Sequence, residues 1–68
     1  MSLGEELRKS RIAAGLTQEE LAFNADISRN YVSLLELGEK SPTVQILLRI
    51  CKAVGVRAST IVARIERS

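Results

Sequence analysis

Two short helical patterns, joined by a bend too tight for one continuous helix, lie within residues 15–38, GLTQEELAFNADISRNYVSLLELG. Thr17 and Glu20 have the spacing of a capping box, in which a hydroxyl and a carboxylate satisfy each other's free backbone N–H groups. The first of the two helices is therefore predicted to start at Gln18. Its inward residues are predicted to be Leu21 and Ala22.

The second helix follows a break at residues 24–27, where Asn and Asp tolerate turn conformations that other residues resist. Ser28 is predicted to cap this helix, and the helical period then divides its residues between two sides. The inward side is Tyr31, Val32 and Leu35. The outward side is Arg29, Asn30, Ser33, Leu34 and Leu37. A helix with this outward side, held at an angle by a tight bend, has the geometry to enter a groove of DNA.

Three more helices are predicted, because glycines punctuate the apolar stretches and no alternating strand pattern occurs. Ser2 and Glu5 have the capping-box spacing that opens the first helix. Its inward residues are predicted to be Leu3, Leu7 and Ala14. The chain is therefore expected to fold as an all-α orthogonal bundle of five helices.

The fourth helix is predicted to begin near Thr43, since Pro42 forces the residue before it away from helical dihedral angles. Its core stripe is predicted to be Val44, Leu47, Leu48, Ile50, Cys51 and Val54. The fifth helix is predicted to begin within a residue or two of Ala58, because Arg57 is a poor cap and Ser59 a better one. Its core residues are predicted to be Ile61, Val62 and Ile65.

The composition fits one small domain spanning residues 1–68, with 46% hydrophobic content near the lower limit for a self-sufficient core. One cysteine and no histidine exclude an internal disulfide framework and the usual zinc-finger spacings, and no cofactor is predicted. No apolar run reaches the roughly 20 residues that span a bilayer, and no signal-peptide core is seen. A cytoplasmic protein without a membrane partner is expected. The net charge of +2 is only weak evidence for a polyanionic partner.

Three segments carry a family resemblance: GLTQEELA at residues 15–22, Ile27-Ser28 at the start of the next helix, and Leu35-Glu36-Leu37-Gly38 at its end. In these segments the chain resembles the phage repressor and Cro-type (XRE-type) helix-turn-helix family. The resemblance continues through Ser41-Pro42-Thr43 into the last two helices, so it covers nearly the whole chain. It implies a five-helix lambda-repressor-like bundle. It also implies a sequence-specific transcriptional regulator that binds double-stranded DNA as a homodimer on a palindromic operator, similar in size to restriction-modification controllers.

Four residues on the outward side are predicted to read bases. They are Arg29, Asn30, Ser33 and Leu34. An arginine can donate a fork to guanine O6 and N7, an asparagine can pair with adenine, a serine can donate or accept, and a leucine can pack against the thymine methyl group. The alternative is a solvated polar face from which Arg29 contacts only phosphate.

Five residues are predicted to bind DNA phosphates. They are Thr17, Gln18, Tyr31, Lys40 and Thr43. Gln18 stands at the amino end of its helix, where its amide and the free N–H groups can meet a phosphate oxygen, and the family resemblance implies the same role. Lys40 and Thr43 flank the connection after the second helix of the motif, although an ordinary capped turn explains Thr43 equally well.

The resemblance also implies a structural ion pair between Arg11 and Glu36, which would position the helices and contact no DNA. A homodimer is expected because one helix end reads only a few base pairs, whereas a two-fold dimer reads two half-sites about 34 Å apart. The candidate dimer residues are Ile46, Ile61 and Ile65. Ile65 alternatively closes the core.

The competing interpretation is an antitoxin-like protein-interaction module whose DNA binding is secondary or lost. Leu34 and Leu37 on the outward side and the modest net charge support it. An enzyme is not expected, because no histidine is present and no serine, cysteine or carboxylate pair has an activating partner. RNA polymerase and a partner protein are further candidate partners, since a chain this short has no obvious effector pocket.

Overall fold

The structure, a computed structural model, describes residues 2–67 and contains five helices joined by short connections. They are α1 (Leu3–Ala13), α2 (Gln18–Ala25), α3 (Arg29–Glu36), α4 (Val44–Val54) and α5 (Ala58–Glu66). No strand occurs within residues 2–67. The all-α fold with five helices that the sequence predicts is therefore confirmed.

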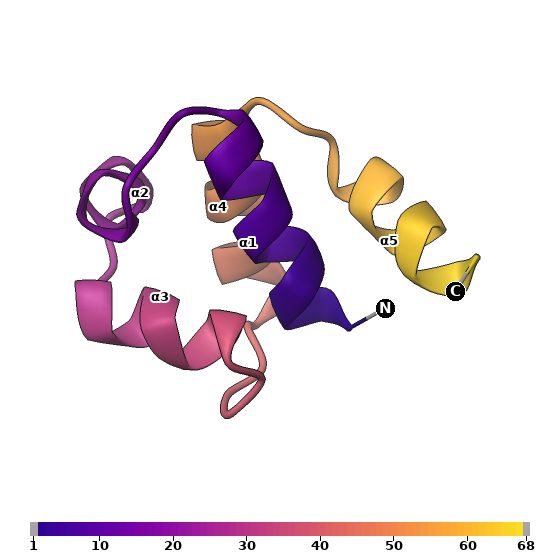
Figure 1. Cartoon of the computed structure of the whole chain (residues 1–68), viewed down its shortest axis with the longest axis horizontal. Helices are drawn as coiled ribbons and strands as arrows, with labels where there is room; N and C mark the ends of the chain where they lie inside the picture. Colours follow the sequence, from indigo (N-terminus) through magenta and orange to yellow (C-terminus); the bar gives the residue numbers. More distant parts are fainter. Residues whose placement is uncertain (1, 68) are drawn as a thin grey trace.

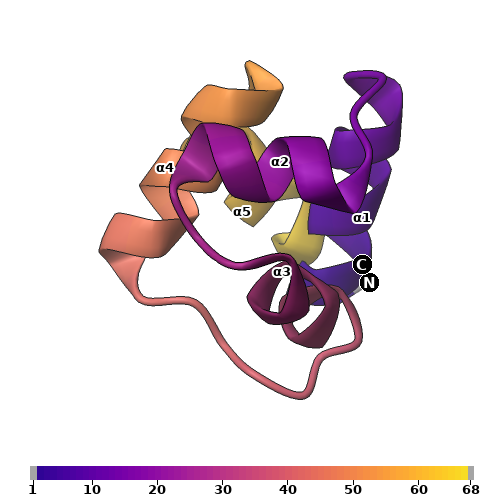
Figure 2. The same cartoon turned by 90° about the vertical axis from the view of Figure 1, so that its left-hand side faces the viewer.

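The helices surround α1, which runs through the middle of the molecule with α4 behind it, α2 and α3 on one side and α5 on the other (Figure 1). α2 is seen end-on in Figure 1 and lengthwise in Figure 2, whereas the reverse holds for α3, so the two helices cross. α3 packs against α1 as well as α2, and α5 packs mainly against α1. The helix with the predicted outward face is thus supported by two neighbours.

Side chains fix the starts of the first four helices, as the sequence predicts. Capping boxes open α1 at Ser2 and α2 at Thr17, and the hydroxyls of Ser28 and Thr43 cap α3 and α4. α5 begins at Ala58, within the predicted range. Its N-cap is Arg57, which makes no side-chain cap hydrogen bond, and Ser59 lies inside the helix. The preference for Ser59 over Arg57 as the cap was therefore wrong.

The core draws on all five helices. Its buried apolar residues are Leu7, Leu21, Ala22, Ala25, Val32, Leu35, Ile50, Cys51, Val54 and Ile61. Residues packed against its edge include Leu3, Tyr31, Ile46, Leu47 and Ile65. Most of the predicted inward positions are confirmed, and the crossing of α2 and α3 follows from burying one face of each helix against this core.

Four predicted core residues lie at the surface instead. Val44 is 74% exposed and Leu48 is 53% exposed, and Val62 and Ala14 are also exposed. Leu48 is turned about 100° from Leu47 around the helix axis, which takes it off the buried face. Val44 is the first residue of α4 and Ala14 is the C-cap of α1, so both stand at helix ends. The predicted stripes were too wide because each helix buries only one face.

Gly4 allows a close approach between α1 and α3. A Cβ atom at this position of α1 would lie 2.6 Å from the carbonyl oxygen of Leu35 and 2.7 Å from that of Glu36. Both contacts are with backbone atoms, which cannot rotate away. The start of α1 therefore rests directly on the last turn of α3.

None of the helices within residues 2–67 has both the length and the apolar character needed to cross a bilayer. Within the same residues, no group of three or more metal-ligating side chains comes together.

Candidate nucleic-acid interface

The turn between α2 and α3 is set by Asp26. Its φ of 58° puts it in the left-handed region, which short polar residues tolerate better than other non-glycine residues do. The N–H of Ile27 donates back to the carbonyl of Ala22 at 3.0 Å, which closes the end of α2. This single residue redirects the chain, so that α3 starts at an angle to α2.

The first turn of α3 presents polar side chains to solvent. The hydroxyl of Ser28 accepts a hydrogen bond from the N–H of Tyr31 at 3.0 Å and so fixes the start of the helix. Arg29 and Asn30 are exposed, while Val32 and Leu35 are buried on the opposite side. The helix is therefore anchored by one face and open on the other, as a groove-reading helix requires.

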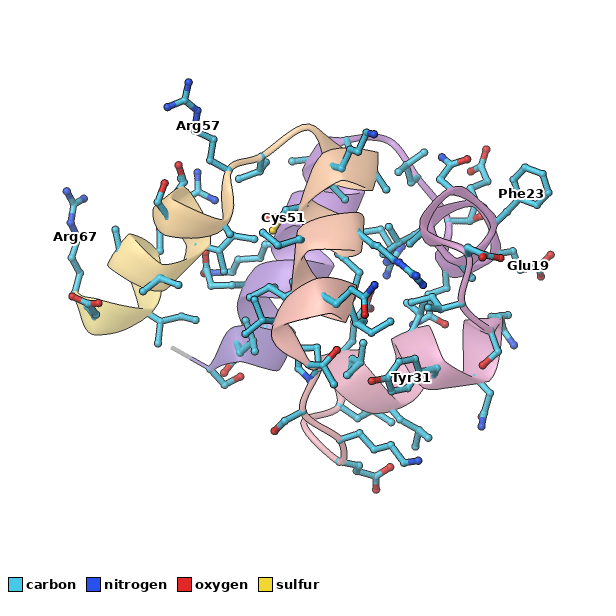
Figure 3. The ribbon with its side chains drawn as sticks, turned by 180° about the vertical axis from the view of Figure 1, so that it is seen from behind. Glu19, Phe23, Tyr31, Cys51, Arg57 and Arg67 are labelled. Carbon is cyan, nitrogen blue, oxygen red and sulfur yellow. The ribbon has the colours of Figure 1, made fainter. Side chains whose placement is uncertain are left out.

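The second turn of α3 is less open than the sequence suggests. Ser33 and Leu34 are half-buried, and the carbonyl of Leu34 accepts hydrogen bonds from the N–H groups of Glu39 and Lys40. Tyr31 is also half-buried and packs against the core edge, as Figure 3 shows for its ring beside α3. Arg29 and Asn30 are consequently the more accessible of the four predicted base-reading residues.

Both predicted phosphate-binding threonines are also helix caps. The hydroxyl oxygen of Thr17 accepts from the N–H of Glu20 at 3.1 Å, and that of Thr43 accepts from the N–H of Ile46 at 3.2 Å. Each hydroxyl proton remains available for donation to an acceptor. Lys40 lies exposed in the connection between α3 and α4. Capping therefore accounts for the position of Thr43 without removing its capacity to donate.

Arg11 and Glu36 form the ion pair that the family resemblance implies. The Nε atom of Arg11 donates to Oε2 of Glu36 at 2.7 Å, and its Nη2 atom donates to Oε1 at 3.0 Å. A third donor, Nη1, reaches the carbonyl of Leu16 at 2.9 Å. The hydrogen bond to Glu36 raises the pKa of the Arg11 guanidinium. This pair ties the end of α3 to α1 and, through Leu16, to the loop before α2.

Gln18 joins the same pair, which the sequence did not reveal. Its Nε2 atom donates to Oε1 of Glu36 at 3.2 Å, and the residue is half-buried. The amide nitrogen has a second proton, which can donate outward to a phosphate oxygen. The sequence places Gln18 at the start of α2, close to the predicted ion pair. It does not show which polar side chains meet, so the contact with Glu36 could not be predicted.

Glu19 and Arg29 form a second interhelical pair that sequence reasoning missed. Arg29 Nε lies 3.9 Å from Glu19 Oε1, and both side chains are largely exposed. The two residues are ten positions apart on different helices, so no periodicity connects them. A carboxylate therefore stands beside one of the predicted base-reading side chains.

The candidate dimer residues have different environments. Ile61 is completely buried in the core, so it is not available to a second copy, and this part of the prediction was wrong. Ile46 and Ile65 are half-buried against the core edge. The more exposed apolar side chains of the same two helices are Val44, Leu48 and Val62.

A family model described as helix-turn-helix matches residues 7–61. The chain is 39% identical over 54 residues to an uncharacterized HTH-type transcriptional regulator, y4dJ, of Sinorhizobium fredii, covering 79% of this chain and 70% of that protein. It is 34% identical over 55 residues to the control protein C.BamHI of Bacillus amyloliquefaciens, covering 79% and 68%. Among solved structures, the restriction-modification controller protein C.AhdI from Aeromonas hydrophila superposes with a TM-score of 0.83 at 32% identity, covering 87% of this chain and 89% of that one.

Proposed function

The chain belongs to the helix-turn-helix family of DNA-binding transcriptional regulators, and from this premise we propose that it acts as a homodimer that reads a palindromic operator in the major groove. The observation that carries the proposal is the exposure of Arg29 and Asn30 on the capped first turn of α3, opposite the buried Val32 and Leu35. Arg29 and Asn30 carry the donors and acceptors that discriminate bases in the major groove.

The predicted phosphate contacts surround this turn. Gln18 and Thr17 stand at the start of α2, and Lys40 and Thr43 stand in the connection after α3. Helix N-termini supply free N–H groups to an anion, and Lys40 adds a cation. These residues would fix the register of α3 on the duplex while its first turn reads sequence.

Dimerisation is supported by apolar side chains left exposed on α4 and α5. Val44, Leu48 and Val62 lie at the surface, and Ile46 and Ile65 of the same helices are half-buried. A second copy would remove this apolar area from water and place two reading helices on successive turns of the duplex. The likeness to C.BamHI and C.AhdI favours the role of a restriction-modification controller.

The test is a titration of the protein onto random duplex DNA at several salt concentrations, followed by selection of bound sequences from a random pool. A regulator should show a steep linear fall of log affinity with log salt, and the selected sites should be palindromic. Sedimentation of the protein with a selected duplex should give two chains per site. Absence of duplex binding at low salt would refute the proposal.

A protein-interaction module is the second candidate, because Phe23 is 86% exposed on α2 and Leu37 is 69% exposed after α3. Exposed apolar side chains of this size are typical of contact surfaces when they gather. Binding to RNA polymerase or to another protein would use them without contradicting DNA binding. Unchanged affinity for duplex DNA in Phe23→Ser, with loss of a protein complex, would assign Phe23 to such a contact.

A further inference from the structure

Glu19 places a carboxylate beside the predicted base-reading turn of α3. It points outward from α2, on the same side of the molecule as the start of α3 (Figure 3). Its Oε1 atom lies 3.9 Å from Nε of Arg29, and the side chains of Arg29 and Glu19 are 65% and 79% exposed. A carboxylate at a surface that meets phosphates opposes binding by charge repulsion. Its position in the first turn of α2 is favourable to the helix dipole, and its distance from Arg29 gives it a second contact.

The contact between Glu19 and Arg29 involves the Nε atom of the guanidinium. An arginine carries five N–H donors in a fixed planar fork, and its long stem has many rotamers when it is free. Nε of Arg29 lies 3.9 Å from Oε1 of Glu19, so the carboxylate attracts the guanidinium across a distance longer than a hydrogen bond. The terminal Nη groups carry four of the five N–H donors and can donate to guanine O6 and N7.

We propose that Glu19 is a positioning residue for Arg29, which narrows the orientations of the guanidinium and so strengthens the preference for one base pair in each half-site. This inference rests on the proposed function. It adds a way in which Arg29 distinguishes its preferred base pair from others. Exposed ion pairs contribute little free energy, so the expected gain in discrimination is about two- to fivefold. The same carboxylate lowers affinity for all sequences, and discrimination improves at the expense of overall binding.

Glu19 is exposed and lies outside the capping box of α2, which is made by Thr17 and Glu20. Loss of its charge in the first turn should cost less than about 1 kcal/mol of stability. Glu19→Gln is therefore expected to fold. Glu39→Gln is the matched control, because Glu39 is another exposed carboxylate next to α3 and no ion pair is recorded for it within residues 2–67.

The experiment first selects a preferred site with the unaltered protein and finds the base pair at which Arg29→Ala loses its preference. Dissociation constants are then measured for the preferred duplex and for a duplex altered at that base pair. Glu19→Gln should bind the altered duplex more tightly and reduce the ratio between the two duplexes by about two- to fivefold. Glu39→Gln should strengthen binding to both duplexes equally. Glu19→Ala repeats the measurement without an amide that could itself read adenine.

The double variant Glu19→Gln/Arg29→Ala separates positioning from other roles. If Glu19 acts through Arg29, replacing Glu19 should leave the ratio unchanged once Arg29 is absent. A ratio that changes in the Arg29→Ala background would mean that Glu19 contacts a base itself, and an unchanged ratio in Glu19→Gln alone would mean that the pair has no effect on reading. Either result overturns this inference while leaving the proposed function intact. An unaltered protein that selects no site would overturn both.

Discussion

Arg11 holds both carboxylate oxygens of Glu36, through Nε to Oε2 at 2.7 Å and Nη2 to Oε1 at 3.0 Å, with only 12% and 4% of the two side chains exposed. Parallel hydrogen bonds between a guanidinium and a carboxylate fix both distance and orientation. Since Gln18 also donates to Glu36, this one carboxylate connects α1, α2 and the end of α3.

Removing one partner of this pair should destabilise the protein strongly. Glu36→Ala leaves the largely buried guanidinium of Arg11 without its carboxylate, and a loss of about 3 kcal/mol in the free energy of unfolding is expected. Urea denaturation gives this value. The double variant Arg11→Met/Glu36→Leu should cost less than the sum of the single losses, because no unpaired charge remains. Additive losses would show that the two side chains act independently.

Gly4→Ala should also destabilise the protein, although alanine favours a helix by about 1 kcal/mol over glycine. The added Cβ atom would meet the backbone carbonyl oxygens of Leu35 and Glu36 at 2.6 and 2.7 Å, so α1 and α3 would have to separate. A net loss of about 1–3 kcal/mol in unfolding free energy is expected. Arg8→Ala, at an exposed position of the same helix, should change the stability by less than about 0.5 kcal/mol. A stabilised Gly4→Ala variant would contradict the close packing.

Arg29→Ala and Lys40→Ala should weaken DNA binding in different ways. Loss of a guanidinium that reads guanine should cost about 1–3 kcal/mol on the preferred site and relax selection at that base pair. Loss of the Lys40 ammonium should weaken all sequences alike and reduce the salt slope by about one. Binding curves on the selected and a scrambled duplex measure both effects. The opposite pattern would exchange the two roles.

Cys51 should react slowly with thiol reagents while the protein is folded. The thiol is buried, and burial raises its pKa, because the thiolate would lose its hydration. Alkylation at pH 8 should be on the order of a hundredfold slower than in urea, since it requires opening of the core. Rapid alkylation of the folded protein would contradict this burial.

The same group gives stability a pH dependence of defined sign. Because the folded-state pKa of Cys51 is raised, its contribution is complete below the unfolded pKa of about 8.5 and is lost as the pH rises through the folded pKa. The free energy of unfolding should therefore decline above about pH 8.5. Cys51→Ala should lack this part of the decline, which urea denaturation between pH 7 and 10 would reveal.

The parts of the fold that depend on near neighbours were predictable from the sequence. Ser2, Thr17, Ser28 and Thr43 each cap a helix through a residue three positions away, so local spacing is sufficient to identify them. The same holds for the turn at Asp26, where residue type and position combine. The starts of α1 to α4 and the bend between α2 and α3 follow from these signals.

Contacts between helices were predictable only where the family resemblance supplied them. The resemblance implied the pair of Arg11 and Glu36, but Gln18 beside Glu36 and Glu19 beside Arg29 went unnoticed. Which polar side chains meet depends on how the helix axes cross, and a periodicity contains no information about that. The exposure of Leu48 has the same origin, because the width of a buried face depends on the neighbour that covers it.

α5 is held mainly by α1, through the buried Ile61 and a pairing of Arg64 with Glu6 at 3.7 Å, and it starts without a side-chain cap. An element attached in this way opens locally at a lower cost than the rest of the molecule. If a second copy covers Val62 and Ile65, association and the closing of α5 become coupled equilibria. Amide hydrogen exchange in α5 should then slow as the protein concentration rises, while exchange in α1 and α3 stays nearly constant.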